Sequence, residues 1–396
     1  MKRIVFAWEI GARRGHAGPM IPLAARLAQA GHRVDAYLSN PEAATGFSGA
    51  SQIQIFPAPR WVGTVLQPEG LNVAEILVNF GFHSADALSQ LVDAWRERIA
   101  GADLLVSNVA PAALLAARSL GVPALEVSQG FHVPPPAFPS PPFRDWEPAP
   151  RARLIASDRR VVQAINSVLT NHGAAPVESI GELFVGRALL QTYPELEMYP
   201  ERGPAEYFGV VPVVGGPRIE WPEGRPRYLA YVYADYRHLD ALLAALARCD
   251  GAVIVICADL DRARRGALAS QRMVFSDALL DFQAMAESAD VVVCHGGHQT
   301  TAETLLVGKP LLLLPTQLEQ FLTTRRVVRQ GAALGILQDV TNPDFSTALK
   351  TVTQNPEFAQ HAGEFAERYR IHRRDAALDT LVARCVAALA QRLPAS

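Results

Sequence analysis

The sequence predicts an α/β protein built from two Rossmann-like, doubly wound domains. Three observations favour this fold class. The chain has 396 residues, too many for one ordinary domain and enough for two α/β domains with substantial cores. Short apolar runs alternate with segments of helical periodicity in both halves. A glycine-rich turn follows an apolar run near the N-terminus and again near residue 296, where open parallel sheets bind ligands.

The first βαβ unit is visible at the N-terminus. Ile4 to Trp8 is an apolar run of strand length, and the glycine-rich loop Gly11 to Gly18 follows it. Helical periodicity over Ile21 to Ala28 then ends near Gly31, before the next strand. This unit begins an N-terminal domain that we expect to cover residues 1–213.

The glycine and proline density of residues 214–227 is typical of an interdomain linker. Strand and helix alternation resumes after it, so a second domain is expected over residues 228–374. The final helical segment, residues 375–393, is expected to return to the first domain.

The second glycine turn has the pattern of an anion site. Asp290 to Cys294 reads as a buried strand, two glycines follow, and helical periodicity opens at His298. Unpaired N–H groups and the positive end of a helix dipole point out of such a junction. Glycine also lets a phosphate approach without a Cβ in the way. The next strand, Pro310 to Leu314, is expected to bring Glu319 and Gln320 to the same edge of the sheet.

These residues resemble the donor signature of family-one glycosyltransferases, HxGxxSxxE followed by GxPxxxxPxxxDQ or EQ, with threonine replacing the serine. The resemblance implies a GT-B fold, in which the two domains face each other across a cleft, and a UDP- or dTDP-hexose as co-substrate. An ordinary βαβ unit with a capping threonine is the alternative. The expected donor-binding residues are Gly15, His295, Gly296, Gly297, Gln299, Thr300, Glu303, Glu319 and Gln320.

The N-terminal loop carries the family's GHxxP element as Gly15, His16 and Pro19. A sugar acceptor is usually a hydroxyl that loses its proton during attack, and an imidazole with a pKa near ~6.5 suits that task. His16 is therefore the expected general base. The alternative is a loop histidine that only caps the following helix.

Relatives orient this histidine with an aspartate at the end of the strand written here as Asp103 to Ser107, where this chain has Asn108. Asparagine accepts the Nδ1–H hydrogen bond but does not offset the charge that develops on the imidazole. Glu9, at the end of the first strand, is the nearest carboxylate that could substitute; the alternative is a solvated loop charge. A second departure is the Ala234-Asp235-Tyr236 turn, which replaces small residues near the diphosphate.

The acceptor site is expected in variable loops of the first domain. The proline-rich stretch Val133 to Pro150 is unsuited to regular structure, and it is either a surface loop or linker, or a rim of the acceptor pocket. Aromatic residues in such loops suit a largely apolar acceptor, although aromatics at helical spacing are more often core. The candidates are Phe80, Phe82, His83, Phe131, His132 and Trp146.

Composition excludes several classes of partner. With 37 basic and 39 acidic residues, the formal charge is −2, so nucleic acid is not an expected partner. The four cysteines are widely spaced, no apolar run is long enough to span a bilayer, and no signal peptide is evident, which together predict a cytoplasmic protein. Asp259-Leu260-Asp261 has the DxD form of a metal site, but a helix cap at Asp261 is the preferred interpretation, and no metal or other cofactor is expected.

Taken together, the residues and the resemblance predict an inverting, metal-independent hexosyltransferase that acts on a small, largely apolar acceptor. The protein is expected to be a monomer or a homodimer. Two alternatives stay open: a non-catalytic homologue acting as a helper or binding protein, and a nucleotide-sugar epimerase of the same fold.

Overall fold

The computed structural model describes residues 1–396 except 12–14, 212–215, 279, 371–375 and 391–396. The chain divides into two compact units, residues 1–211 with 376–396 and residues 212–375. The ends of the expected linker and of the expected C-terminal helix, residues 214–215, 375 and 391–393, lie outside the described residues.

The first unit is a six-stranded, wholly parallel sheet in the order β3-β2-β1-β4-β5-β6. Its two central strands, β1 and β4, are buried and mostly apolar because a parallel sheet is covered on both faces. The strands are β1 Arg3–Trp8, β2 Arg33–Leu38, β3 Gln54–Pro57, β4 Leu104–Ser107, β5 Ala124–Ser128 and β6 Ala188–Leu190. The expected strands at 4–8 and 103–107 match β1 and β4 to within one residue.

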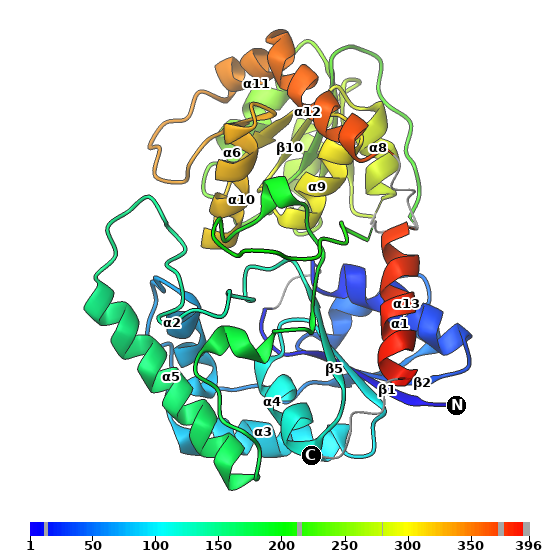
Figure 1. Cartoon of the computed structure of the whole chain (residues 1–396). Coiled ribbons are helices and arrows are strands. Elements are labelled where there is room, and N and C mark those ends of the chain that lie inside the picture. Colours follow the sequence, from blue (N-terminus) through cyan, green and yellow to red (C-terminus); the bar gives the residue numbers. More distant parts are fainter. Residues whose placement is uncertain (12–14, 212–215, 279, 371–375, 391–396) are drawn as a thin grey trace. The chain divides into compact units, whose positions relative to one another are not determined.

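Helices cover this sheet in two groups. The last helix of the chain packs against the first, and Figure 1 shows α13 beside α1. The other long helices pack with one another. The helices are α1 Ala17–Gln29, α2 Val73–Leu77, α3 Ala85–Ile99, α4 Pro111–Leu120, α5 Arg151–Asn171 and α13 Ala376–Ala390, with single turns η1 Pro41–Ala44, η2 Ala50–Gln52, η3 Val78–Phe82, η4 Ile180–Leu183 and η5 Pro194–Leu196.

The second unit repeats the same topology with the order β12-β11-β10-β7-β8-β9, and again every pair is parallel. The strands are β7 Arg227–Tyr231, β8 Ala252–Ile256, β9 Met273–Ser276, β10 Val291–Cys294, β11 Leu311–Leu313 and β12 Ala333–Gly335. The helices are α6 Leu239–Ala247, α7 Arg262–Leu268, α8 Phe282–Ser288, α9 His298–Leu306, α10 Leu318–Arg329, α11 Phe345–Gln354 and α12 Pro356–Arg368.

Each sheet has one topological switch point, where the strand order reverses direction. It lies between β1 and β4 in the first unit and between β10 and β7 in the second. Doubly wound sheets bind ligands outside the carboxyl ends of the strands at this point. The expected catalytic residues Glu9, His16 and Asn108 follow β1 and β4, and His295 follows β10. The fold therefore brings the chemically interesting residues of each half to its switch point.

Candidate active site

The catalytic candidate in the first unit is a hydrogen-bonded pair at the switch point. His16 precedes α1, but its side chain does not cap that helix. Instead its Nδ1 lies 2.8 Å from Asn108 Oδ1. The Asn108 amide is itself fixed, because its Nδ2 donates to the Val127 carbonyl oxygen over 2.6 Å. Asn108 therefore presents an oxygen to His16, which places the imidazole proton on Nδ1 and leaves a lone pair on Nε2.

Two neighbours determine where the imidazole sits. The ring stacks on Trp8, with centroids 5.1 Å apart. On the other side, a Cβ on Gly11 would lie 2.6 Å from His16 Nε2, and Gly11 has φ +99°. Glycine is therefore required at this position by both the close approach and the backbone conformation. Burial lowers the pKa of His16, although the hydrogen bond to Asn108 opposes the shift. The ring is thus held neutral at pH 7, as a general base must be.

The turn that carries Asn108 is strained and is held by a buried acid. Val109 has φ +55°, which is unusual for a β-branched residue. Its N–H donates to Glu126 Oε1 over 2.9 Å, and the Ser107 hydroxyl donates to the other carboxyl oxygen. Backbone strain of this kind persists only where the surroundings over-determine it. Glu126 thus holds the turn that carries Asn108, and no pattern in the sequence indicated that role.

The expectation that Glu9 supplies a negative charge to His16 is wrong. Glu9 is buried, and its Oε2 accepts the Ala112 N–H at the start of α4 over 3.1 Å. Burial raises the pKa of Glu9 to about 8, so at pH 7 the carboxyl group is mostly protonated. A neutral acid does not offset a charge on an imidazolium. Glu9, the residue after β1, instead satisfies an N–H of α4.

A second histidine lies near the pair. Burial, followed by the repulsion of a charge on His16, lowers the pKa of His132 to about 3. His132 is partly exposed, as are Phe80, His83 and Trp146. Two other acceptor candidates are core residues instead, because Phe82 is 0% exposed and Phe131 is buried in a stack on Phe143 with centroids 4.6 Å apart. Buried rings fill the interior and do not form an open rim, so these two assignments are corrected.

In the second unit the glycine turn has the expected form. Gly296 has φ +74°, and a Cβ there would lie 2.6 Å from Thr324 Oγ1. A Cβ on Gly297 would meet nothing within 4 Å, so the space in front of this residue is open. The N–H groups of the first turn of α9 follow directly, with Thr300 among them. This is the arrangement that binds anions at helix N-termini.

Both ring nitrogens of His295 bond to backbone groups. Nε2 accepts the Tyr233 N–H over 3.0 Å, and Nδ1 therefore carries the proton and donates to the Leu314 carbonyl oxygen over 2.8 Å. The ring also stacks on Tyr233 with centroids 4.5 Å apart, and the residue is 2% exposed. His295 thus joins the ends of β7, β10 and β11 and shapes the turn, and its expected contact with a diphosphate stays a prediction.

The remaining donor candidates lie on α9 and in the first turn of α10. Glu303 is buried and accepts a hydrogen bond from Gln299 Nε2. Gln320 Oε1 accepts the Thr316 N–H over 2.8 Å, which commits that oxygen to its own loop. Burial raises the pKa of Glu319 to about 7. The Ala234-Asp235-Tyr236 turn brings the Tyr236 ring edge-on to His295, 5.2 Å between centroids.

The DxD segment is used as a helix cap. Asp261 Oδ1 accepts the Arg264 N–H over 2.9 Å at the start of α7. Among the described residues, no group of three or more histidine, cysteine, aspartate or glutamate side chains is arranged to hold a metal ion. The same part of the chain contains no helix with the length and apolarity needed to cross a bilayer.

Two doubly wound parallel sheets, each with a glycine turn near its switch point, are the architecture of the GT-B fold. Residues 266–373 match the family model described as the glycosyltransferase family 28 C-terminal domain. The zeaxanthin glucosyltransferase of Pseudescherichia vulneris is 25% identical over 341 residues, covering 80% of this chain and 82% of that protein. A PGL/p-HBAD biosynthesis glycosyltransferase of Mycobacterium tuberculosis is 31% identical over 176 residues, 42% of this chain and 40% of that protein.

Solved structures agree on the fold. The calicheamicin glycosyltransferase CalG4 superposes with a TM-score of 0.72 at 18% identity, covering 99% of both chains. The glycosyltransferase VinC in complex with dTDP gives 0.66 at 19% identity, covering 98% of this chain and 99% of that one. These structures confirm the GT-B fold expected from the sequence. The family-model match and the similarity to the zeaxanthin glucosyltransferase indicate the expected enzyme class, a glycosyltransferase.

Proposed function

We propose that this enzyme transfers a hexose from a UDP- or dTDP-sugar to a hydroxyl group of a largely apolar acceptor, with inversion at the anomeric carbon. The observation that carries the proposal is the His16–Asn108 hydrogen bond. It leaves Nε2 of a neutral imidazole with a lone pair, which is what a general base for a hydroxyl requires.

The reaction balances as a single displacement. The acceptor hydroxyl gives its proton to His16 Nε2 while its oxygen forms a bond to the anomeric carbon. The bond between that carbon and the diphosphate oxygen breaks on the opposite side, and the electron pair leaves with the diphosphate. The first-turn N–H groups of α9, in front of Gly297, stabilise the charge on the leaving group.

Asn108 is neutral, and its role differs from that of a carboxylate. It fixes the His16 tautomer through Oδ1 and anchors itself to Val127 through Nδ2. The imidazolium that forms is transient, because the proton passes to solvent after the step. The positioning function of the pair is therefore kept without a buried charge, at the cost of less electrostatic stabilisation.

Two groups of similar proteins support the choice of substrates. Two solved structures of the same fold contain thymidine diphosphate (dTDP). Proteins with similar sequences are named for zeaxanthin and sterol glucosylation, both with large apolar acceptors. We therefore propose an isoprenoid-like or polyketide-like alcohol or phenol as the acceptor of this chain.

The test is a coupled binding and transfer assay. Calorimetric titration with UDP and dTDP identifies the nucleotide, and the matching hexose donor is then incubated with a panel of apolar alcohols and phenols. We expect one hexose added to an acceptor, with the opposite anomeric configuration by NMR. Donor conversion without any acceptor would support the epimerase alternative. Absence of both nucleotide binding and transfer would support the helper alternative.

A further inference from the structure

Four polar side chains of α5 hold two loops of the first unit. Arg153, Ser157 and Arg160 recur at spacings of four and three residues, so they share one face of the helix, and Asp158 follows Ser157 directly. They bond to the segment before α2, to His83 and to the proline-rich loop. Arg160 Nε, for example, donates to the His83 carbonyl oxygen over 2.8 Å.

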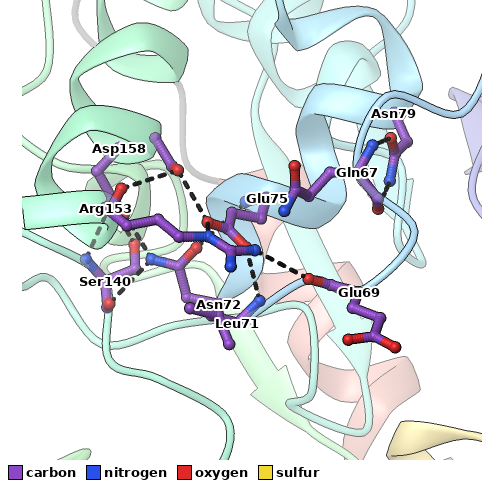
Figure 2. Close-up of polar contacts among 10 residues, drawn as sticks. Gln67, Glu69, Leu71, Asn72, Glu75, Asn79, Ser140, Arg153 and Asp158 are labelled. Atoms are coloured by element: carbon purple, nitrogen blue, oxygen red, sulfur yellow. Dashed lines mark hydrogen bonds and ion pairs between the residues drawn. The ribbon is translucent and has the colours of Figure 1, made fainter. Parts of the chain in front are cut away.

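Asp158 anchors the proline-rich loop. It is 0% exposed and accepts three hydrogen bonds: from the Ser140 N–H at 2.9 Å, from the Ser140 hydroxyl at 2.7 Å and from Asn72 Nδ2 at 2.7 Å. Figure 2 shows Asp158 of α5 facing Ser140 and Asn72. A buried carboxylate with three donors is a high-cost arrangement that is tolerated only when fully bonded. Ser140 is therefore not part of a loose linker.

Arg153 anchors the segment before α2. Its guanidinium makes a two-pronged contact with Glu75, at 2.7 and 2.8 Å, and also donates to the Glu69 carbonyl oxygen over 3.2 Å. Glu75 in turn accepts the Leu71 N–H over 2.8 Å. Figure 2 shows this chain of contacts from Arg153 through Glu75 to Leu71. Bidentate pairs of this kind fix geometry as well as adding energy.

The two loops are also joined to each other. The Phe143 N–H donates to the Leu71 carbonyl oxygen over 2.8 Å. Within the first loop, Asn79 Oδ1 accepts the N–H groups of Leu66 and Gln67, both at 2.8 Å. Phe131, next to His132, stacks on Phe143. A continuous set of contacts thus runs from α5 to the segment beside the His16 site.

Four apolar side chains of these two loops are exposed. Val62 is 85% exposed, Val65 61% and Leu66 47%, all in the loop before α2, and Phe138 of the proline-rich loop is 45% exposed. Apolar side chains on an unanchored loop would collapse onto the nearest surface, because burying them is favourable. Here the hydrogen bonds at the base keep them presented to solvent.

We propose that these four side chains of α5, which we call the α5 bracket (Arg153, Ser157, Asp158 and Arg160), position the two loops so that their exposed apolar side chains receive the acceptor. The inference rests on the proposed function, since it assigns the part of the chain that holds the acceptor. Asp158 and Arg153 are positioning residues: they act through the loops and do not touch the reacting atoms.

The test compares two buried aspartates of the first unit. Asp158→Asn breaks the bracket, whereas Asp35→Asn breaks a buried pair with Arg3, whose Nε lies 2.8 Å from Asp35 Oδ2, at β2. Both variants are expected to lose stability. Only Asp158→Asn should raise the acceptor KM, by on the order of tenfold, with the donor Kd unchanged. It should also increase hydrogen exchange at residues 61–72 and 133–146.

A second pair covers the case in which Asp158→Asn does not fold. Arg153 is partly exposed, so Arg153→Gln is expected to fold, and Arg159→Gln on the exposed side of the same helix is its control. Equal acceptor KM values for the two, or unchanged exchange at both loops, would overturn the bracket. A wild-type protein that transfers no hexose would instead overturn the proposed function, while exchange still reports on the bracket.

Discussion

The two switch points of this molecule carry the same residue type at the same kind of place, and they use it differently. His16 follows β1 and has one ring nitrogen bonded to a side chain, which leaves Nε2 with its lone pair. His295 follows β10, and both of its ring nitrogens bond to backbone groups of neighbouring strands. A histidine thus keeps the lone pair on one ring nitrogen in the first unit and connects strand ends in the second. The difference lies in the partners and not in the position.

The largest expected effect is the loss of the reactive histidine. His16→Ala should lower kcat by about 10²- to 10⁴-fold, because the general base is removed. The thermal midpoint should fall less than in His295→Ala, since only Asn108 Oδ1 loses its partner. Steady-state kinetics and thermal unfolding check both parts. If the kcat of His16→Ala stays within about threefold of the wild-type value, His16 is not the general base.

His295→Ala should act mainly on stability, whereas His16→Ala should act mainly on kcat. It leaves the Tyr233 N–H and the Leu314 carbonyl oxygen unpaired, at about 1–3 kcal/mol for each buried group. We expect a lower midpoint of urea unfolding and weaker nucleotide binding by calorimetry. If His295→Ala keeps the wild-type midpoint but loses nucleotide affinity, the ring contacts the diphosphate directly and is not only a connector of strand ends.

A matched pair of glycines tests the placement of His16. Gly11→Ala puts a Cβ 2.6 Å from Nε2 at φ +99°, so the imidazole must move. A misplacement of this size should lower kcat by roughly 10²-fold. Gly15→Ala is the control, because its Cβ would meet nothing within 4 Å. Equal activity of the two variants would show that the position of His16 is not critical.

Asn108→Asp tests whether a carboxylate could replace the asparagine beside His16. The new oxygen would face the Val127 carbonyl, which the Asn108 amide now satisfies at 2.6 Å. We expect a loss of about 1–3 kcal/mol in the free energy of unfolding and no gain in kcat. Urea titration and kinetics measure the two. If Asn108→Asp instead raises kcat and leaves the free energy of unfolding unchanged, a carboxylate at this position would serve catalysis better than the asparagine does.

The smallest expected effect is a displaced pH profile. Burial lowers the pKa of His16, and the base must be neutral to act. The rate falls as pH drops through the pKa of the folded enzyme, so the acid limb of kcat should lie below about pH 6.5, the ordinary histidine value. Measuring kcat at saturating donor and acceptor from pH 5 to 9 locates the limb. An acid limb above the ordinary value would contradict the burial argument.

The glycine turns and the strands around them could be predicted because they depend on local pattern. Apolar runs of four to six residues followed by glycine specify strand and turn with little help from the rest of the chain. The pairing of His16 with Asn108 came from the resemblance to family-one glycosyltransferases, and the structure contains a hydrogen bond between the two side chains. Sequence reasoning failed for Glu9 and Phe82, because burial depends on which elements pack over a position.

By itself, the sequence determined the two parallel sheets, the position of each glycine turn and the set of chemically active residues at the strand ends. Only the tertiary structure decided which of those residues are available for chemistry. It made Glu9 a neutral group at pH 7, bound His295 on both nitrogens and left His16 Nε2 with its lone pair. The physical reason is that hydrogen-bond partners and desolvation come from segments distant in the sequence, such as Val127 for Asn108 and Leu314 for His295.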